Sequence, residues 1–112
     1  MNKAIYHAKD LIEKGEGFVT AEIVGSEGSS PRKRWAWLMM THAGEFYGTV
    51  GGGKLEAEVE TLCRTVLETR EEQTVLFRLD RDAQAGLDMR CGGDVTVKVA
   101  YQTPEQAREF VA

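Results

Sequence analysis

The order in which helical and strand-like patterns follow one another constrains the fold of this chain more than any other feature of its sequence. Apolar residues recur at helical spacing from Asn2 to Gly15 and again from Gly53 onward, and residues 103–106 form a helix start with a capping box. Five segments typical of strands lie among them, at 18–24, 36–41, 46–50, 74–80 and 94–101. Because strands and helices do not alternate strictly, we expect an α+β fold rather than a doubly wound parallel sheet. The fold should have two layers, a mixed or mostly antiparallel sheet and about three helices.

Length and composition narrow the class of protein. The chain has 112 residues, of which 42% are hydrophobic and 29% charged, as in a soluble globular domain. We therefore expect residues 1–112 to form one domain without a Rossmann domain. A net charge of −4 argues against a nucleic-acid binder, and no apolar run approaches the ~20 residues that span a membrane. With two cysteines and no signal-peptide pattern, a cytoplasmic protein is expected.

Three glycine-containing segments, at 25–32, 48–56 and 91–94, are the candidates for a binding site. Glycine lets the backbone approach a ligand closely and adopt positive φ without a steric penalty. The run Gly51-Gly52-Gly53 lies directly before a predicted helix, where free amide groups and the helix dipole favour a phosphate. A tight strand-to-helix turn would explain the same run. Arg32, which follows Ser29 and Ser30 closely, could pair with a phosphate through two hydrogen bonds.

Other motifs carry less information. Residues 48–54 fit the start of a Walker A loop, but Leu55 stands where a serine or threonine must bind magnesium. Glu56 is the acidic residue beside a glycine segment, and either compensation of the helix dipole or a ligand role explains it. His7 and His42 are expected to have surface or packing roles.

The two cysteines differ in setting. Cys63 falls on the apolar stripe of the second predicted helix and is expected in the core. Cys91 precedes two glycines in a predicted loop, so its thiol is either accessible or without consequence. Their separation does not resemble a zinc motif. We therefore predict no metal site and no catalytic residue.

Taken together, the three segments resemble the amino-terminal domain of the XdhC/CoxI family of molybdenum-hydroxylase maturation factors. The matching pieces are Gly28-Ser29-Ser30-Pro31-Arg32, Gly48-Thr49-Val50-Gly51-Gly52-Gly53 with Leu55-Glu56, and Cys91-Gly92-Gly93 before a valine-rich strand. The similarity extends from the first helix to about Tyr101. Each piece alone is weakly specific, whereas three in the same order and spacing are fairly specific.

The resemblance implies a non-enzymatic factor that binds molybdenum cofactor, the molybdopterin that carries the metal. Such a factor helps to sulfurate the cofactor and delivers it to an apo-enzyme of the xanthine dehydrogenase or carbon monoxide dehydrogenase type. The implied cofactor-binding residues are Ser29, Ser30, Arg32, Gly51, Gly52, Gly53, Glu56, Cys91, Gly92 and Gly93. A cysteine desulfurase and a separate Rossmann-domain subunit are implied partners. No binding to nucleic acid or to a membrane is expected. A homodimer is a further expectation.

Two other hypotheses stay open at this point. The chain could be a ligand-free interaction or regulatory module that retains the fold, because Trp35 and Trp37 closely follow the first glycine segment and interfaces favour aromatic residues. A tryptophan that fills the space at the glycine segments would favour this hypothesis. An independent hydrolase that uses Glu56 or Cys91 lacks a visible base partner.

Overall fold

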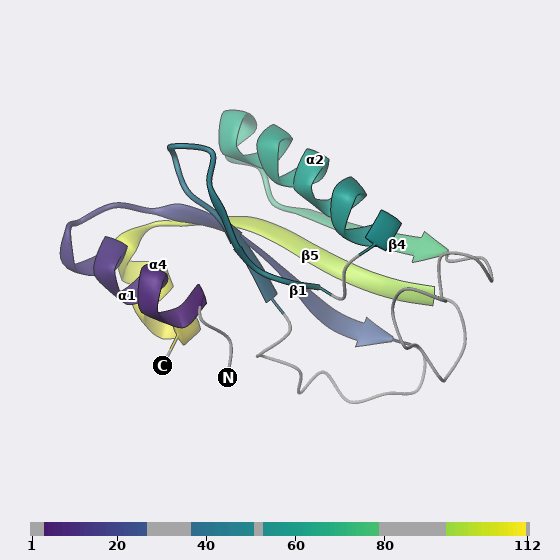
Figure 1. The fold of residues 1–112 in the computed structure, drawn as a ribbon, viewed down its shortest axis with the longest axis horizontal. Coiled ribbons are helices and arrows are strands. Elements are labelled where there is room, and N and C mark those ends of the chain that lie inside the picture. The colour runs from purple at the N-terminus through teal and green to yellow at the C-terminus, as the bar shows by residue number, and fades with distance from the viewer. Residues whose placement is uncertain (1–3, 27–36, 51–52, 79–93, 112) are drawn as a thin grey trace.

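The computed structural model describes residues 4–26, 37–50, 53–78 and 94–111, and its helices and strands follow the predicted order (Figure 1). The elements are α1 (Ala4–Glu13), β1 (Phe18–Ser26), β2 (Trp37–Met40), β3 (Phe46–Gly48), α2 (Gly53–Thr69), β4 (Gln73–Arg78), β5 (Asp94–Gln102) and α4 (Pro104–Val111). The prediction of an α+β domain with about three helices is confirmed for this part of the chain. No described helix is long and apolar enough to cross a membrane.

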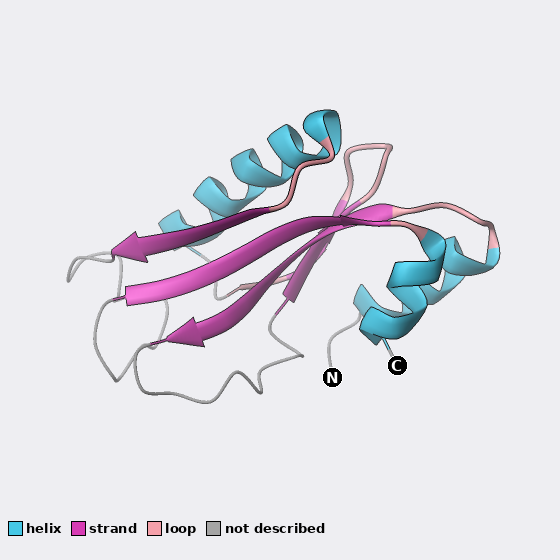
Figure 2. Cartoon of the chain, turned by 180° about the vertical axis from the view of Figure 1, so that it is seen from behind, coloured by secondary structure: helices cyan, strands magenta, loops and turns pink. Residues whose placement is uncertain are grey.

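One five-stranded sheet, in the order β3-β2-β1-β5-β4, organises the fold. All four pairs of neighbouring strands are antiparallel. The central strand β1 pairs with β2 on one side and with β5 on the other, and the paired residues of β1 and β5 are 69 to 84 positions apart in sequence. Helix α2 covers one face of the sheet, while α1 and α4 pack on the other face at one end (Figure 2).

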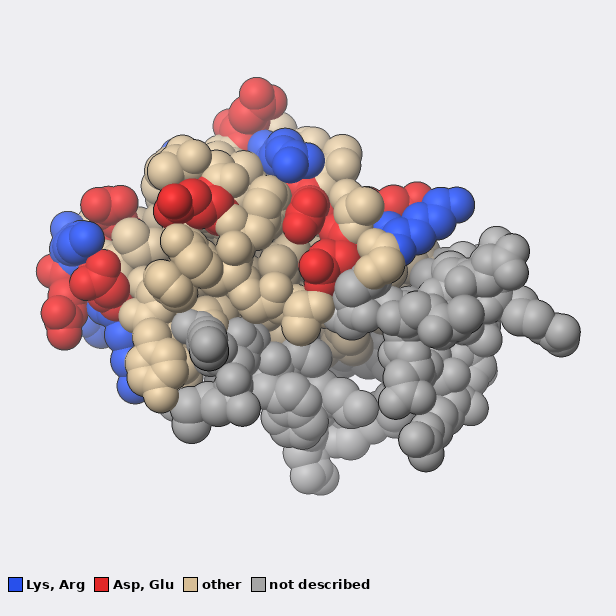
Figure 3. Space-filling view, in the orientation of Figure 1, with Lys and Arg blue, Asp and Glu red and all other residues tan. Residues whose placement is uncertain are grey.

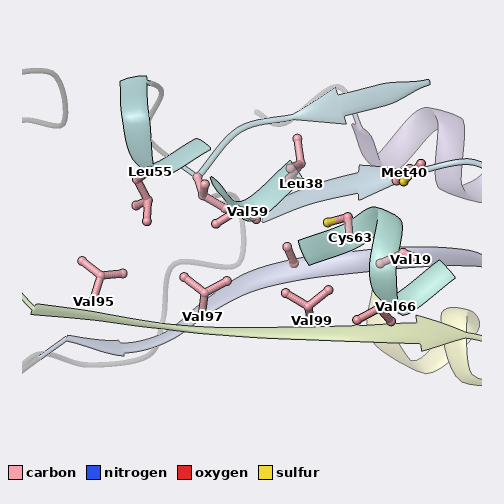
Figure 4. Packing of buried hydrophobic residues seen from close by; sticks show 12 residues of the cluster. Val19, Leu38, Met40, Leu55, Val59, Cys63, Val66, Val95, Val97 and Val99 are labelled. Carbon is pink, nitrogen blue, oxygen red and sulfur yellow. The ribbon is translucent and has the colours of Figure 1, made fainter. Parts of the chain in front are cut away.

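The larger core lies between α2 and the sheet (Figure 4). Alternate residues of β1 and β5 point to this face, as the two-residue period of a β-strand requires. They meet the apolar stripe of α2, whose buried members are Leu55, Val59, Cys63 and Val66. Burial raises the pKa of the Cys63 thiol to about 12. Cys63 is therefore a protonated core residue, as its place on the stripe predicted.

A smaller core on the opposite face joins α1 and α4 to the sheet. Trp37 is buried there, and its ring meets Phe110 edge-on with the ring centroids 5.0 Å apart. The predicted capping box is present at the start of α4. The backbone N–H of Thr103 donates to Gln106 Oε1 at 3.0 Å, and the backbone N–H of Gln106 donates to the Thr103 hydroxyl at 3.2 Å. These two bonds satisfy amide groups that a helix start otherwise leaves unpaired.

Tyr101, near the end of β5, contacts residues from three other parts of the chain. The Tyr101 hydroxyl oxygen is 2.8 Å from His42 Nε2, and the Arg70 guanidinium lies 3.9 Å from the centre of the Tyr101 ring. Gly17 lies directly beneath this tyrosine. A Cβ at position 17 would lie 2.5 Å from the tyrosine hydroxyl oxygen and closer still to the carbonyl oxygen of Gln102. The packing around position 17 therefore requires glycine, which has no side chain.

Candidate functional site

The chain's connections divide between the two ends of the antiparallel sheet. Segment 27–36 links β1 to β2, residues 49–52 link β3 to α2, and segment 79–93 links β4 to β5. In an antiparallel sheet with this order of strands, these three connections all belong to the same end. The three predicted glycine-containing segments fall on or beside these connections. We call this end of the sheet the glycine end.

The pairing of residues shows that the strand ends coincide there. Ser26, the last residue of β1, pairs with Val95 of β5, and Arg78, the last residue of β4, pairs with Asp94. Figure 1 shows α2 beginning over the same end of the sheet, at Gly53. The ends of β1 and β4 and the start of β5 therefore lie side by side, whereas β2 begins at Trp37 opposite Glu22, four residues before the end of β1.

The start of α2 combines a glycine of positive φ with an exposed lysine. Gly53 adopts a φ of +68°, in the left-handed region that favours glycine, and a Cβ placed there would have no heavy atom within 4 Å. Lys54 is exposed in the first helical turn. The helix runs for 17 residues from this point. Its first amide groups have no partners within the helix and carry partial positive charge, which is the chemistry that attracts phosphate.

Glu56 connects this helix to the end of β3. Its Oε1 atom accepts a hydrogen bond from the hydroxyl of Thr49 and another, 3.2 Å long, from the backbone N–H of Val50. The carboxylate is therefore held against the residues that precede the glycine run. The sequence leaves open whether Glu56 compensates the helix dipole or binds a ligand, and the structure adds a further role, because Glu56 fixes the approach of the chain to α2.

Acidic side chains gather over α2, with few basic ones between them, in the view of Figure 3. The described side chains of α2 in this view therefore do not form a general positive surface for an anion. In the part of the chain that the structure describes, no three His, Cys, Asp or Glu side chains are grouped so as to hold a metal ion.

Comparisons with known proteins identify the family. A model of the XdhC and CoxI family matches residues 11–80, which is more than half of the chain. This chain belongs to the XdhC and CoxI family. The match extends from α1 through β4, so it includes two of the three glycine-containing segments.

Two individual proteins are similar to this XdhC/CoxI-family chain. The uncharacterized protein YqeB of Escherichia coli K12 is 31% identical over 93 residues, which are 83% of this chain and 17% of YqeB. A crystal structure described as a xanthine dehydrogenase from Bacillus halodurans superposes with a TM-score of 0.66 and 25% identity, over 96% of this chain and 32% of that one. The chain therefore spans a third or less of each protein.

Two of the predicted cofactor-binding residues of this XdhC/CoxI-family chain, Gly53 and Glu56, fall within the described residues, and both lie at the glycine end. The others lie outside the described residues: Ser29, Ser30, Arg32, Gly51, Gly52, Cys91, Gly92 and Gly93. Sequence reasoning missed Thr49 and Val50, which bond to Glu56. A threonine seven residues before a glutamate is not by itself a signal for such a bond.

Substitutions at Glu56 separate its hydrogen bonds from its charge. Glu56→Ala leaves the Thr49 hydroxyl and the Val50 amide without their acceptor, so we expect the free energy of unfolding to fall by about 1–2 kcal/mol. Both bonds end on one oxygen atom, which a glutamine side chain also supplies, so Glu56→Gln should cost less than half as much. Urea unfolding of the two variants measures the difference. Equal losses would contradict the role given to these bonds.

Proposed function

We propose that this chain binds molybdenum cofactor at the glycine end and assists sulfuration of the cofactor and its insertion into a molybdenum hydroxylase. The client would be an apo-enzyme of the xanthine dehydrogenase or carbon monoxide dehydrogenase type. Membership of the XdhC and CoxI family supports this role, and so does the likeness to a structure described as a xanthine dehydrogenase. The observation that carries the proposal is the common end of the sheet from which all three glycine-containing segments arise.

The described residues fit the phosphate of molybdopterin. Gly53 leaves open space beside the first amide groups of α2, and the exposed Lys54 adds a positive charge in the same turn. The Glu56 carboxylate bonds to Thr49 and Val50 and thereby holds the chain that leads into the turn. These features suit a ligand that is held mainly by backbone donors at a helix start.

The remaining predicted residues have complementary chemistry. Ser29, Ser30 and Arg32 would donate hydrogen bonds to phosphate oxygens, and Gly51, Gly52, Gly92 and Gly93 would allow the backbone close to the pterin. The Cys91 thiol would contact the metal or shape its loop. When bound, the cofactor supplies the molybdenum centre that the client enzyme uses. Capture and release of this ligand require no covalent step by the protein, so we propose a role without catalysis.

The proposed function implies three protein partners. An apo molybdenum hydroxylase would receive the cofactor, a cysteine desulfurase would supply sulfur, and a Rossmann-domain subunit would supply the other half of the family's architecture. All of these would meet the protein in the cytoplasm.

The test is retention of metal-free molybdopterin during anaerobic gel filtration, followed by pterin fluorescence. We expect the protein to retain the pterin and Gly53→Ala to weaken retention by about tenfold. Alanine at a φ of +68° costs roughly 1–2 kcal/mol, and relief of this strain moves the amide groups of the turn.

Gly44→Ala is the matched control. Gly44 also has a positive φ, +86°, and open space around it, but it lies in the hairpin between β2 and β3 at the other end of the sheet. The control should retain the pterin as the unaltered protein does. Failure of the unaltered protein to retain any pterin would end the proposal, and equal effects of the two substitutions would place the site elsewhere.

The position of Trp37 favours binding over the hypothesis of a ligand-free module. This tryptophan packs against Phe110 in the smaller core, on the face of the sheet opposite α2. It therefore does not fill space beside the start of α2. Trp35 lies outside the described residues.

A further inference from the structure

Strand β4 forms a long edge of the sheet. Among the described strands β4 pairs with β5 alone, over six residues, whereas the opposite edge strand β3 has three residues. An edge strand presents a row of backbone N–H and C=O groups that can pair with another strand. The length of β4 makes it the stronger template of the two.

Among the described residues, this edge lacks the usual features that prevent pairing. The strand reads Gln73-Thr74-Val75-Leu76-Phe77-Arg78, with no proline and no lysine, and its register with β5 runs without a bulge. Such devices normally protect exposed edges. Leu76 is 49% exposed, and it is one of two large hydrophobic side chains among the described residues with such exposure.

The charges along the strand are self-complementary. Glu71 and Glu72 precede β4, and an arginine ends it at position 78. The side chain of Glu72 is 56% exposed, and its ion pair with Lys98 is long, at 3.9 Å, so it remains accessible. A strand with a negative start and a positive end attracts a second copy of itself in the antiparallel direction.

We propose that two copies of this chain associate through β4, antiparallel and centred on Val75. This register places Val75 opposite its counterpart, Thr74 opposite Leu76, and Glu72 opposite Arg78, each twice by symmetry. The arrangement covers Leu76, pairs two β-branched residues across the strands and joins opposite charges. The two sheets become one continuous sheet with both α2 helices on the same face, and the two glycine ends point in opposite directions.

A charge-reversal experiment tests both the interface and its register. Sedimentation velocity should show the protein dimerising with rising concentration, because a six-residue strand pair is smaller than a standard stable interface of ~1,600 Å². Glu72→Arg places arginine opposite arginine, and Arg78→Glu places glutamate opposite glutamate, so each variant alone should be monomeric. An equimolar mixture should dimerise again, because both contacts in the mixed pair then join opposite charges.

Two control variants distinguish this interface from a general effect of charge. Glu13→Arg reverses an exposed charge on α1 and should leave dimerisation unchanged. Leu76→Lys should abolish it without disturbing the core, because Leu76 is half-exposed. Circular dichroism checks that each variant is folded. A monomer at all concentrations, dimers of either single charge variant, or a mixture that stays monomeric would each overturn the proposal.

Discussion

Replacement of Leu55 by alanine is expected to lower the free energy of unfolding by about 3–4 kcal/mol. Leu55 is 1% exposed and lies in the first turn of α2, above Val95 of β5 (Figure 4). Truncation removes buried apolar surface and leaves a cavity between the helix and the sheet, and both effects are unfavourable. Urea unfolding followed by circular dichroism gives the free energy directly.

The cost at Leu55 also bears on the proposed site, because this side chain holds the start of α2 against the sheet. Leu76→Ala is the matched control. It removes the same atoms from a half-exposed position and should cost less than about 1 kcal/mol. A loss at Leu55 as small as that at Leu76 would show that the first turn of α2 is not anchored by this contact.

Replacement of Gly17 by alanine is expected to lower the free energy of unfolding by about 3 kcal/mol, for a different reason. The added methyl group would overlap the carbonyl oxygen of Gln102 and the hydroxyl of Tyr101. The carbonyl belongs to β5, which pairs with β1 along its whole length, so it cannot move without disturbing the sheet. Overpacking of this kind costs about 1–3 kcal/mol and more where the backbone is involved.

Gly15→Ala is the control that measures the cost of placing alanine at a positive φ without any steric overlap. Gly15 has a φ of +77° with nothing within 4 Å of the added atom, so alanine there should cost only about 1 kcal/mol. The double variant Gly17→Ala, Tyr101→Phe removes the hydroxyl but keeps the clash with the carbonyl. We expect it to remain strongly destabilised. Stability close to that of the unaltered protein in either Gly17 variant would contradict this account.

Local patterns in the sequence predicted the helices well because the residues that begin and end them act on their own neighbours. Thr103 and Gln106 form both bonds of the predicted capping box. Gly15, where the first helical pattern ends, takes the left-handed conformation that is common after the end of a helix. The stripe on α2 predicted its buried face, including Cys63. Each of these features depends on interactions within a few residues, which a sequence pattern records.

The order of the strands could not be predicted in the same way. The pairing of β1 with β5 joins residues 18–26 to residues 94–102, and no local spacing specifies a partner that far along the chain. For the same reason Gly17 gave no signal of its contact with Tyr101. Of the predicted site, Gly53 and Glu56 lie within the described residues and the other members lie outside them, so the site stays a prediction.

Both termini of the described chain lie with the paired helices α1 and α4, where Ala4 and Ala107 share the smaller core (Figure 2). The start of α2 and the paired ends of β1 and β5 lie at the opposite extremity of the sheet. A tag or a fused protein at either terminus would therefore project away from the surface that we assign to the pterin. Immobilised by its terminus on a sensor chip, the molecule would present that surface to the solution, which suits it to direct kinetic measurements of pterin binding.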